Sequence, residues 1–251
     1  MGSMRKILAV IPCYNEAARL QPGAFVGFVR DNPAVAFLFV NDGSTDATGS
    51  LLDDLVAQEP EGLFVLHLEH NRGKAEAVRR GVLRAFELGA ELCGYWDADL
   101  ATPLEVILDF AKVLDGTDAV MVFGSRVRLL GRHIRRSPHR HYLGRLFASL
   151  VSLSLRLPIY DTQCGAKLFR ANNLLRQAFT EPFELGWSFD VELFLRLMRL
   201  AAHDPELNVR SQLIEFPLQA WTDAPGSKLR LRDFPRLGLE LTKIARMSRK
   251  E

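Results

Sequence analysis

The 251-residue sequence predicts an α/β fold in which a mostly parallel central sheet is flanked by helices. Short apolar segments rich in Val, Leu and Phe alternate with longer segments of helical periodicity, and short polar connections join them. Such strand–helix–strand alternation gives right-handed crossovers and a sheet covered on both faces. The composition, 48% hydrophobic and 25% charged residues, suits one large core and excludes a disordered or collagen-like chain.

The first half of the chain supplies most of the sheet. Buried strands are predicted at residues 6–11, 35–40, 63–68, 92–96 and 119–123. Each segment is short, apolar and bounded by turn residues, as strands of parallel sheets are. Between them, the periodicity predicts helices at residues 45–58, 73–88 and 103–114.

The second half departs from this alternation. It contains an apolar helix at residues 143–157, a second helix that begins at Val191, and a strand at residues 213–218. The sequence shows no internal repeat and no linker. We therefore predict one domain over residues 4–230, followed by a C-terminal helical tail over residues 231–251.

Polar loops follow the first four predicted strands, at residues 12–16, 41–46, 71–74 and 97–99. Ligands of open parallel sheets bind beyond the carboxyl ends of the strands, so we expect the functional site there. Asp97 and Asp99 are spaced so that both side chains leave an extended segment on the same side. Oxygen ligands of this kind suit Mg²⁺ or Mn²⁺, although a solvated turn would also explain the pair.

Two further charged residues follow strands. Asp42 precedes a helix start, which would place it near a base or a ribose hydroxyl; alternatively, it stabilises its own turn. Lys74 opposes the dipole of the helix that it begins, which indicates an anionic partner. A salt bridge to Glu76 or Glu16 would explain Lys74 equally well.

The formal net charge of +2 hides an uneven distribution. Residues 119–160 contain no Asp or Glu and eight arginines. This stretch is either a solvated surface or a site for an anion, such as a phosphate or an acidic lipid surface. Nucleic acid is disfavoured because few aromatic residues lie between the arginines.

Cysteine usage and hydropathy bear on the compartment. The three cysteines lie far apart and form no C-x-x-C motif, which argues against a disulfide framework or zinc ribbon and favours a reducing, cytoplasmic setting. No run without Asp, Glu, Lys or Arg exceeds ten residues. We therefore expect no signal peptide, membrane anchor or spanning helix, and at most peripheral association with a membrane.

Three segments, residues 10–16, 40–46 and 97–99, resemble the nucleotide-sugar signatures of family-2 glycosyltransferases with the GT-A fold. Residues 124–126, 161–169, 187–192 and 226–228, with Trp221, are similar to dolichyl-phosphate glucosyltransferases and the wider polyprenol-phosphate glycosyltransferase group. The string at residues 161–169 is the most specific. The resemblance covers residues 5–230.

This resemblance implies roles for individual residues. Pro12, Tyr14, Glu16 and Asp42 would line the nucleoside pocket, while Asp97 and Asp99 would hold Mg²⁺ or Mn²⁺ and the donor diphosphate. Lys74 is counted with these nucleotide-sugar-binding residues because its position at a helix start indicates an anionic partner. The residues expected to meet acceptor or donor phosphate are Arg126, Arg140, Arg145, Gln163 and Lys228.

The chain also departs from the family pattern. Asn41 stands where many relatives have a second Asp, which would alter base contacts. Ala101 stands where the mannosyl enzymes have Gln. This difference favours the glucosyl branch.

The function that the resemblance implies is metal-dependent, inverting transfer of a sugar, with UDP-glucose as the expected donor, to a polyprenyl monophosphate at a membrane surface. Such a phosphate is already anionic near neutral pH and hardly needs a general base. An alcohol acceptor would need one, and Asp190 or Asp161 would supply it. We count Asp99 and Asp190 as the catalytic candidates, although Asp190 could instead cap the helix that begins at Val191.

Two alternatives remain: a soluble family-2 glycosyltransferase with a non-lipid alcohol acceptor, and a nucleotide-sugar-binding protein without turnover. Apolar residues of the arginine-rich stretch could contact a lipid chain or belong to the core; they are Leu143, Leu146, Phe147, Leu150 and Leu157.

Overall fold

The computed structural model describes residues 6–135, 138–203, 208, 210–222 and 234–248. The elements in chain order are β1 (Ile7–Cys13), α1 (Pro22–Asp31), β2 (Val35–Asp42), α2 (Thr48–Gln58), β3 (Leu63–Leu68), α3 (Lys74–Glu87), β4 (Leu92–Trp96), α4 (Val106–Gly116), β5 (Met121–Ser125), β6 (His133–Arg135), α5 (Pro138–Leu155), β7 (Ala166–Arg170), α6 (Asn173–Thr180), α7 (Phe189–Ala202), β8 (Leu213–Pro217), β9 (Ala220–Thr222) and α8 (Phe234–Ser248).

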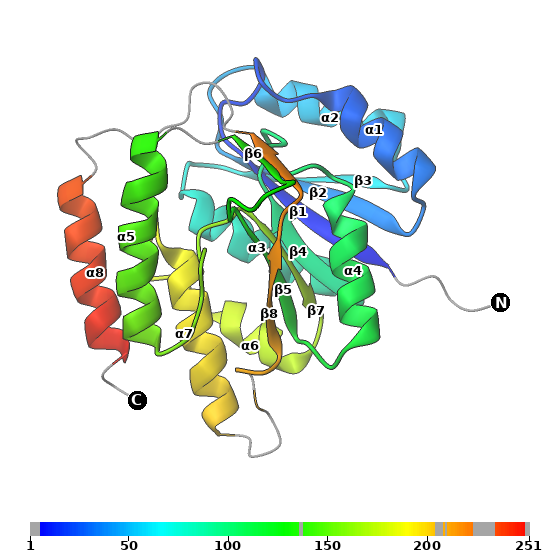
Figure 1. Cartoon of the computed structure of the whole chain (residues 1–251). Coiled ribbons are helices and arrows are strands. Elements are labelled where there is room, and N and C mark those ends of the chain that lie inside the picture. Colours follow the sequence, from blue (N-terminus) through cyan, green and yellow to red (C-terminus); the bar gives the residue numbers. More distant parts are fainter. Residues whose placement is uncertain (1–5, 136–137, 204–207, 209, 223–233, 249–251) are drawn as a thin grey trace.

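A seven-stranded sheet forms the centre of the molecule, in the order β3-β2-β1-β4-β7-β5-β8 (Figure 1). All neighbours pair in parallel except β7, which is antiparallel to both β4 and β5. A small parallel pair, β6 with β9, lies apart from this sheet. The mostly parallel sheet predicted from the sequence is confirmed.

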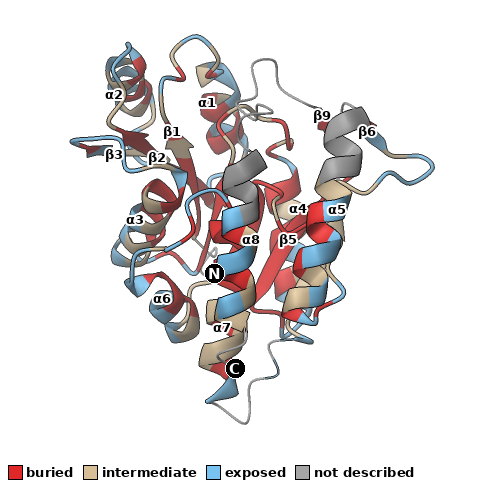
Figure 2. Cartoon of the chain, turned by 90° about the vertical axis from the view of Figure 1, so that its left-hand side faces the viewer, coloured by how far each residue is buried: buried red, intermediate tan, exposed pale blue. Residues whose placement is uncertain are grey.

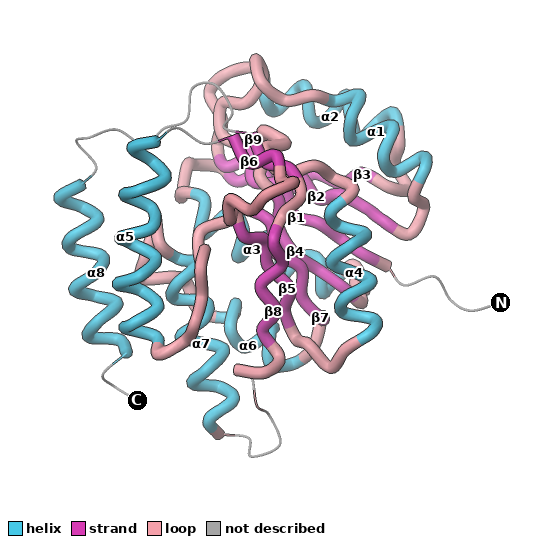
Figure 3. Tube along the Cα trace, viewed as in Figure 1, coloured by secondary structure: helices cyan, strands magenta, loops and turns pink. Residues whose placement is uncertain are grey.

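Helices cover both faces of the sheet (Figure 3). One apolar layer packs α1, α2 and α4 against β1, β2 and β4. The other packs α3, α5, α6, α7 and α8 against the opposite face. The strands are mostly buried, while α5 and α8 carry buried and exposed residues on different faces (Figure 2). This division is what an amphipathic helix on a sheet requires.

The predicted strands at residues 63–68 and 92–96 agree with β3 and β4, and the other predicted strands differ from the observed ones by a few residues. Five elements were not predicted: α1, β6, β7, α6 and β9. Strand β7 was missed because its second residue, Lys167, is charged and breaks the apolar run, although the structure buries it fully. A buried lysine is rare unless paired, and its partner is distant in sequence.

Helix α8 is bound to the rest of the molecule. Ile244 is fully buried, and the Glu240 carboxylate accepts hydrogen bonds from the backbone N–H groups of Trp187 and Ser188, at 3.1 and 2.9 Å. The predicted boundary between residues 230 and 231 lies outside the described residues. Among the helices that the structure describes, none has the length and hydropathy to cross a bilayer.

Candidate functional site

The ends of three adjacent strands, β2, β1 and β4, gather the expected donor residues. Pro12 lies near the end of β1, Asp42 ends β2, and Asp97 directly follows β4. Because these strands are parallel neighbours, their carboxyl ends meet at one edge of the sheet. The structure therefore brings together the polar loops that the sequence singled out.

The loops after β1 and β2 are tied to each other. The Asn15 backbone N–H donates to Ser44 Oγ (3.0 Å), and the Thr45 N–H donates to Asn15 Oδ1 (2.9 Å). The buried Thr48 Oγ1 accepts from the backbone N–H of Glu16 at 2.8 Å. Gly43 turns the second loop at φ +61°, and a Cβ there would meet the backbone of residues 70 and 71. Tyr14 lies between these contacts, half-buried.

Asp42 organises a different loop from the one predicted. Its two carboxylate oxygens accept from the backbone N–H groups of Arg72 and Gly73, each at 2.8 Å. The interpretation that Asp42 stabilises its own turn is wrong, because its carboxylate bridges from β2 to the loop after β3. It thereby fixes the start of α3, where Lys74 lies.

Glu16 is buried and pairs with Arg19, whose Nη2 lies 2.5 Å from Glu16 Oε1. The positive charge of Arg19 also acts on Asp99. Arg19 was not among the predicted site residues. Its signal was the spacing of three residues from Glu16, which lets the two side chains meet within one turn.

Asp97, Asp99 and Lys74 form the charged centre of the site. Lys74 Nζ lies 2.5 Å from Asp97 Oδ1, so neither Glu76 nor Glu16 is its partner. Burial and the neighbouring Asp97 charge raise the pKa of Asp99. Partial burial opposes the charged form of Lys74, yet Asp97, Asp190 and Asp99 raise its pKa. The site thus contains two neighbouring carboxylates, Asp97 and Asp99, and one ammonium, that of Lys74.

A divalent cation fits this arrangement. The described residues contain no group of three or more His, Cys, Asp or Glu side chains that could hold a metal ion. Asp97 and Asp99 would therefore supply the carboxylate ligands, and Mg²⁺ and Mn²⁺ commonly take the remainder from water and substrate phosphate. Burial and the Asp97 charge, which raise the pKa of Asp99, disfavour its carboxylate form, and a bound cation would favour that form.

Residues 161–165 border the site. The Asp97 backbone N–H donates to Gly165 O at 3.0 Å, and a Cβ on Gly165 would lie 1.8 Å from Asp97 Oδ2. Asp161 accepts from Arg126 Nε and Nη2, at 2.6 and 2.8 Å. Burial opposes the charge of Arg126, but Asp161 raises its pKa. Arg126 also lies over the Trp221 ring, 5.2 Å from its centroid.

Two adjoining depressions extend from this segment along α5. The first is a small hollow lined by Arg126, Gly144, Arg145, Phe147, Ala148, Tyr160, Asp161, Thr162 and Gln163. The second, which we call the α5 groove, is open, about 430 Å³ in volume, and lined by Arg145, Ser149, Ser152, Leu153, Pro158, Ile159 and Tyr160. Arg145 and Tyr160 belong to both, with the guanidinium 3.7 Å from the ring centroid.

One residue that lines the hollow, Thr162, carries a buried polar atom without a partner. Thr162 is 1% exposed, and within the described parts of the chain its Oγ1 has no hydrogen-bond partner. Buried hydroxyl groups are normally hydrogen-bonded, so this one is an exception beside the hollow. Arg126, Arg145 and Gln163, all predicted for the acceptor, border the same hollow.

Asp190 lies in the first turn of α7 and is buried. The N-cap of that helix is Ser188, so the interpretation that Asp190 caps it is wrong. Asp190 Oδ1 accepts from Lys167 Nζ at 2.6 Å and from the Tyr95 hydroxyl. Lys167 was not among the predicted site residues, although its ammonium pairs directly with Asp190.

Two predicted residues cannot be placed. Lys228 and the side chain of Arg140 lie outside the described residues, as do residues 226 and 227 of the resembling segment. Their expected role in phosphate binding stays a prediction.

Comparison with known proteins gives a consistent picture. The profile described as Glycosyl transferase family 2 matches residues 8–175. The dolichyl-phosphate beta-glucosyltransferase of Drosophila melanogaster is 35% identical over 240 residues, covering 89% of this chain and 69% of the relative. The polyprenol monophosphomannose synthase of Mycolicibacterium smegmatis is 29% identical over 196 residues, covering 76% and 72%.

Among solved structures, glucosyl-3-phosphoglycerate synthase from Mycobacterium tuberculosis in complex with uridine-diphosphate matches with a TM-score of 0.66 and 16% identity. The match covers 97% of this chain and 80% of that one. The same synthase with Mn²⁺, uridine-diphosphate and glucosyl-3-phosphoglycerate gives a TM-score of 0.66 at 17% identity, covering 96% and 78%. At such identity, the likeness concerns the fold.

Proposed function

Since this chain belongs to glycosyl transferase family 2, we propose that it transfers a sugar, with inversion, from a nucleoside-diphosphate donor to a polyprenyl monophosphate. The chain is a glycosyltransferase with the GT-A fold, as its sequence predicts. UDP-glucose is the donor that we propose, because several relatives similar to this chain are named dolichyl-phosphate beta-glucosyltransferases. The polyprenyl acceptor is supported by the names of both the glucosyl and the mannosyl relatives.

The single observation that carries this proposal is the meeting of Asp97, Asp99 and Lys74 where the carboxyl end of β4 lies beside the N-terminal end of α3. Two carboxylates suit a metal ion that is shared with a diphosphate, and an ammonium beside them suits the diphosphate itself. Asp42 and the tied loops after β1 and β2 adjoin them, where Pro12, Tyr14 and Glu16 are proposed to meet the nucleoside. A bound Mg²⁺ or Mn²⁺ would neutralise charge that develops on the leaving diphosphate.

The hollow beside residues 161–165 has room for about one water molecule, so we assign the acceptor phosphate to its rim, where Arg145 also borders the open α5 groove. Arg126 and Arg145 supply positive charge there, while Thr162 and Gln163 supply hydrogen-bonding groups. Arg126 already gives two donors to Asp161, so Arg145 is the cation better able to turn to a phosphate. The α5 groove continues from Arg145 and offers Leu153, Pro158 and Ile159 to the start of the lipid chain.

The protein's own contribution to the chemistry is then orientation. A phosphomonoester is anionic near neutral pH, since its second pKa is about 6, and it attacks without first losing a proton to a base. Holding two reactants in line contributes several kcal/mol to lowering the barrier, on the order of 7–11 for the best-oriented reactions. Asp190 is not needed as a base in this scheme.

The alcohol-acceptor alternative requires such a base, and the geometry weakens the case for it. Asp190 is 5% exposed and shares one oxygen between Lys167 and Tyr95. Asp161 is paired with Arg126. A general base must come within about 3 Å of the proton that it removes, and these carboxylates are engaged elsewhere.

A donor and acceptor panel tests the proposal. The protein is incubated with Mn²⁺ and UDP-glucose, other UDP-sugars or GDP-mannose, with and without a short polyprenyl phosphate, and the released nucleotide and lipid product are measured. We expect UDP-glucose consumption to rise with the polyprenyl phosphate and to need Mn²⁺ or Mg²⁺. If no donor is consumed faster with the lipid phosphate, or if a polyprenyl alcohol serves as well, the proposal is wrong.

A further inference from the structure

Lys167 lies wholly inside the sheet, directly beneath the site. It is the second residue of β7, and its side chain is 0% exposed. In the sheet register it pairs with Tyr95 of β4 on one side and with Phe123 of β5 on the other. Its ammonium lies 5.2 Å from the centroid of the Tyr95 ring.

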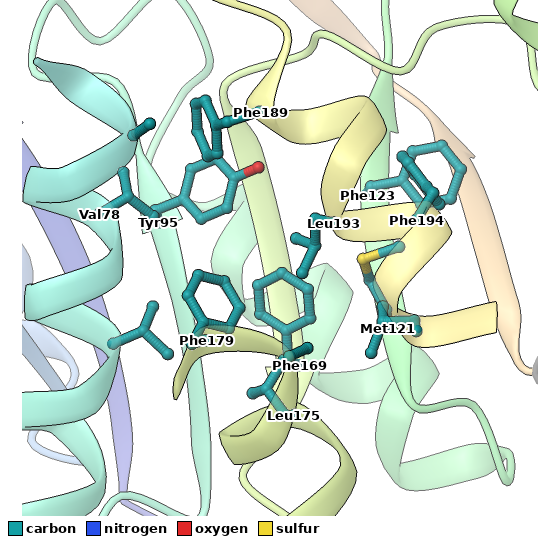
Figure 4. Close-up of a cluster of buried hydrophobic side chains, with 14 of the residues drawn as sticks. Val78, Tyr95, Met121, Phe123, Phe169, Leu175, Phe179, Phe189, Leu193 and Phe194 are labelled. Carbon is teal, nitrogen blue, oxygen red and sulfur yellow. The ribbon is translucent and has the colours of Figure 1, made fainter. Parts of the chain in front are cut away.

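The Lys167 ammonium makes three hydrogen bonds. It donates to Asp190 Oδ1 at 2.6 Å, to Cys164 O at 2.7 Å and to Thr162 O at 3.1 Å. An ammonium has three donors and no acceptor, so this group is fully satisfied. The Tyr95 hydroxyl donates to the same Asp190 oxygen, and Figure 4 shows it pointing toward α7.

Two of these bonds hold residues 161–165, the segment that lies between the donor and acceptor regions. Gly165 O accepts from the Asp97 backbone, and its Cα packs against the Asp97 carboxylate. At the other end, Asp161 holds Arg126. Thr162, between them, lines the hollow. Lys167 therefore holds the backbone of residues 161–165, which contacts Asp97 at one end and Arg126 at the other.

Stability alone does not account for this ion pair. Removing two charges from water is costly, and well-packed apolar residues in place of a buried pair are often neutral or stabilising. An apolar side chain would nonetheless leave the Thr162 and Cys164 carbonyls without their donor. The special contribution of Lys167 is thus to the position of residues 161–165.

We propose that Lys167 is a positioning residue for the transfer reaction, which sets the acceptor hollow in line with Asp97, and that Asp190 serves as its counterion. The inference rests on the proposed function, because only a reaction between two bound partners needs this alignment. Asp190 then acts as the counterion of Lys167 and not as a general base.

The test compares two double variants. K167M/D190L removes both charges together, so that no unpaired ion is left in the core. The control R196M/E192L removes another pair on α7, whose arginine also binds backbone carbonyls, at residues 178, 181 and 182, away from the strand ends. Circular dichroism and thermal unfolding establish that each variant folds.

Three readouts are measured: the kcat of transfer, the KM for the donor, and hydrogen exchange of the Asp97 amide and residues 161–165. We expect K167M/D190L to lower kcat about 100-fold, the usual effect of a misplacement near 1 Å, and to change KM by less than about threefold. Exchange at the Asp97 amide and residues 161–165 should accelerate. R196M/E192L should keep kcat within about threefold and leave exchange at these residues unchanged.

Other results would overturn the inference. A K167M/D190L variant with near wild-type kcat, or equal losses in both double variants, would show that the Lys167 pair is structural only. If the wild-type protein transfers no sugar to any lipid phosphate, the proposed function fails, and hydrogen exchange alone still decides whether Lys167 holds residues 161–165.

Discussion

Asp97 is positioned by contacts on several sides. Lys74 pairs with its carboxylate, Gly165 O accepts from its backbone, and the Gly165 Cα leaves no room for a side chain beside it. The chain then turns sharply, because Leu100 has a φ of +53°, a strained value for a leucine. Asp99 lies within this turn, in which the Leu100 backbone N–H donates to Asp97 O at 3.3 Å, and burial and the neighbouring Asp97 charge raise its pKa.

Replacing Gly165 with Ala should damage donor binding. The new Cβ would lie 1.8 Å from Asp97 Oδ2, so the carboxylate must move. Overpacking of this kind costs about 1–3 kcal/mol, and we expect Mn²⁺–UDP affinity, measured by calorimetry, to fall about tenfold. Gly116→Ala is the matched control, since nothing lies within 4 Å of a Cβ there. Equal affinities in the two variants would contradict this account.

Replacing Lys74 with Met should strengthen binding of the metal alone. Lys74 Nζ lies 2.5 Å from Asp97 Oδ1 and competes with a cation for it. Both side chains are over one third exposed, so the pair contributes no more than about 1 kcal/mol. Without nucleotide, we expect the Mn²⁺ affinity of K74M, measured by titration, to rise up to about fivefold. Lys112→Met, which removes an exposed pair with Asp109, should change nothing. Weaker Mn²⁺ binding by K74M would refute the competition.

At the scale of elements, α5 has two different sides. Phe147 and Val151 are buried against the core, whereas Leu146, Leu150 and Leu153 are 59%, 42% and 78% exposed. The exposed leucines are spaced by four and three residues and so share one face of the helix. The sequence left open whether these apolar residues belong to the core or contact a lipid. Phe147 and Leu157 are buried in the core, while Leu146 and Leu150 are exposed. The side chain of Leu143 lies outside the described part of the structure.

The exposed leucines predict an interfacial role for α5. We expect the variant L150E/L153E to bind phosphatidylglycerol vesicles at least about tenfold more weakly in sedimentation, because two apolar contacts are lost. Leu130→Glu, at a fully exposed residue before β6, is the control and should bind as wild type does. Vesicle binding by the wild type at low and at high salt separates the apolar from the electrostatic part. No binding at either salt concentration would refute this role.

The sequence predicted the elements with local signals and missed those that depend on distant partners. Helix α3 and strand β4 were recognised because their own residues carry the periodicity. In β7, Lys167 interrupts the apolar pattern, and its counterion, Asp190, lies 23 residues away in the sequence. The donor residues were predictable because they lie at or beyond the carboxyl ends of strands. The pairing of Lys74 with Asp97 was not, because it depends on how α3 packs beside β4.

The whole molecule keeps its three thiols out of solvent. Cys13, Cys93 and Cys164 are all free and buried. Burial raises the pKa of Cys93 to about 12 and that of Cys164 to about 11, and it raises that of Cys13 still further. The thiolate is the reactive form, so each thiol is both inaccessible and protonated near neutral pH.

Thiol labelling should therefore report on global unfolding. At pH 8 we expect a colorimetric thiol reagent to label none of the three cysteines in the native chain and all three in denaturant, where the pKa of a free thiol is about 8.5. A native cysteine that reacts as fast as it does in denaturant would show that the fold opens locally around it.

The antiparallel strand β7 has a consequence for synthesis of the chain. Strands β1 to β4 have all been made by residue 96, but the free edge of β4 gains its partner only when residues 166–170 follow. An unpaired apolar edge invites association with other chains until it is covered. The nascent protein therefore passes through a stage, some seventy residues long, in which the half that carries Asp42, Lys74 and Asp97 is complete in sequence yet open at one side. A truncation that ends before β7 should aggregate, whatever nucleotide is supplied.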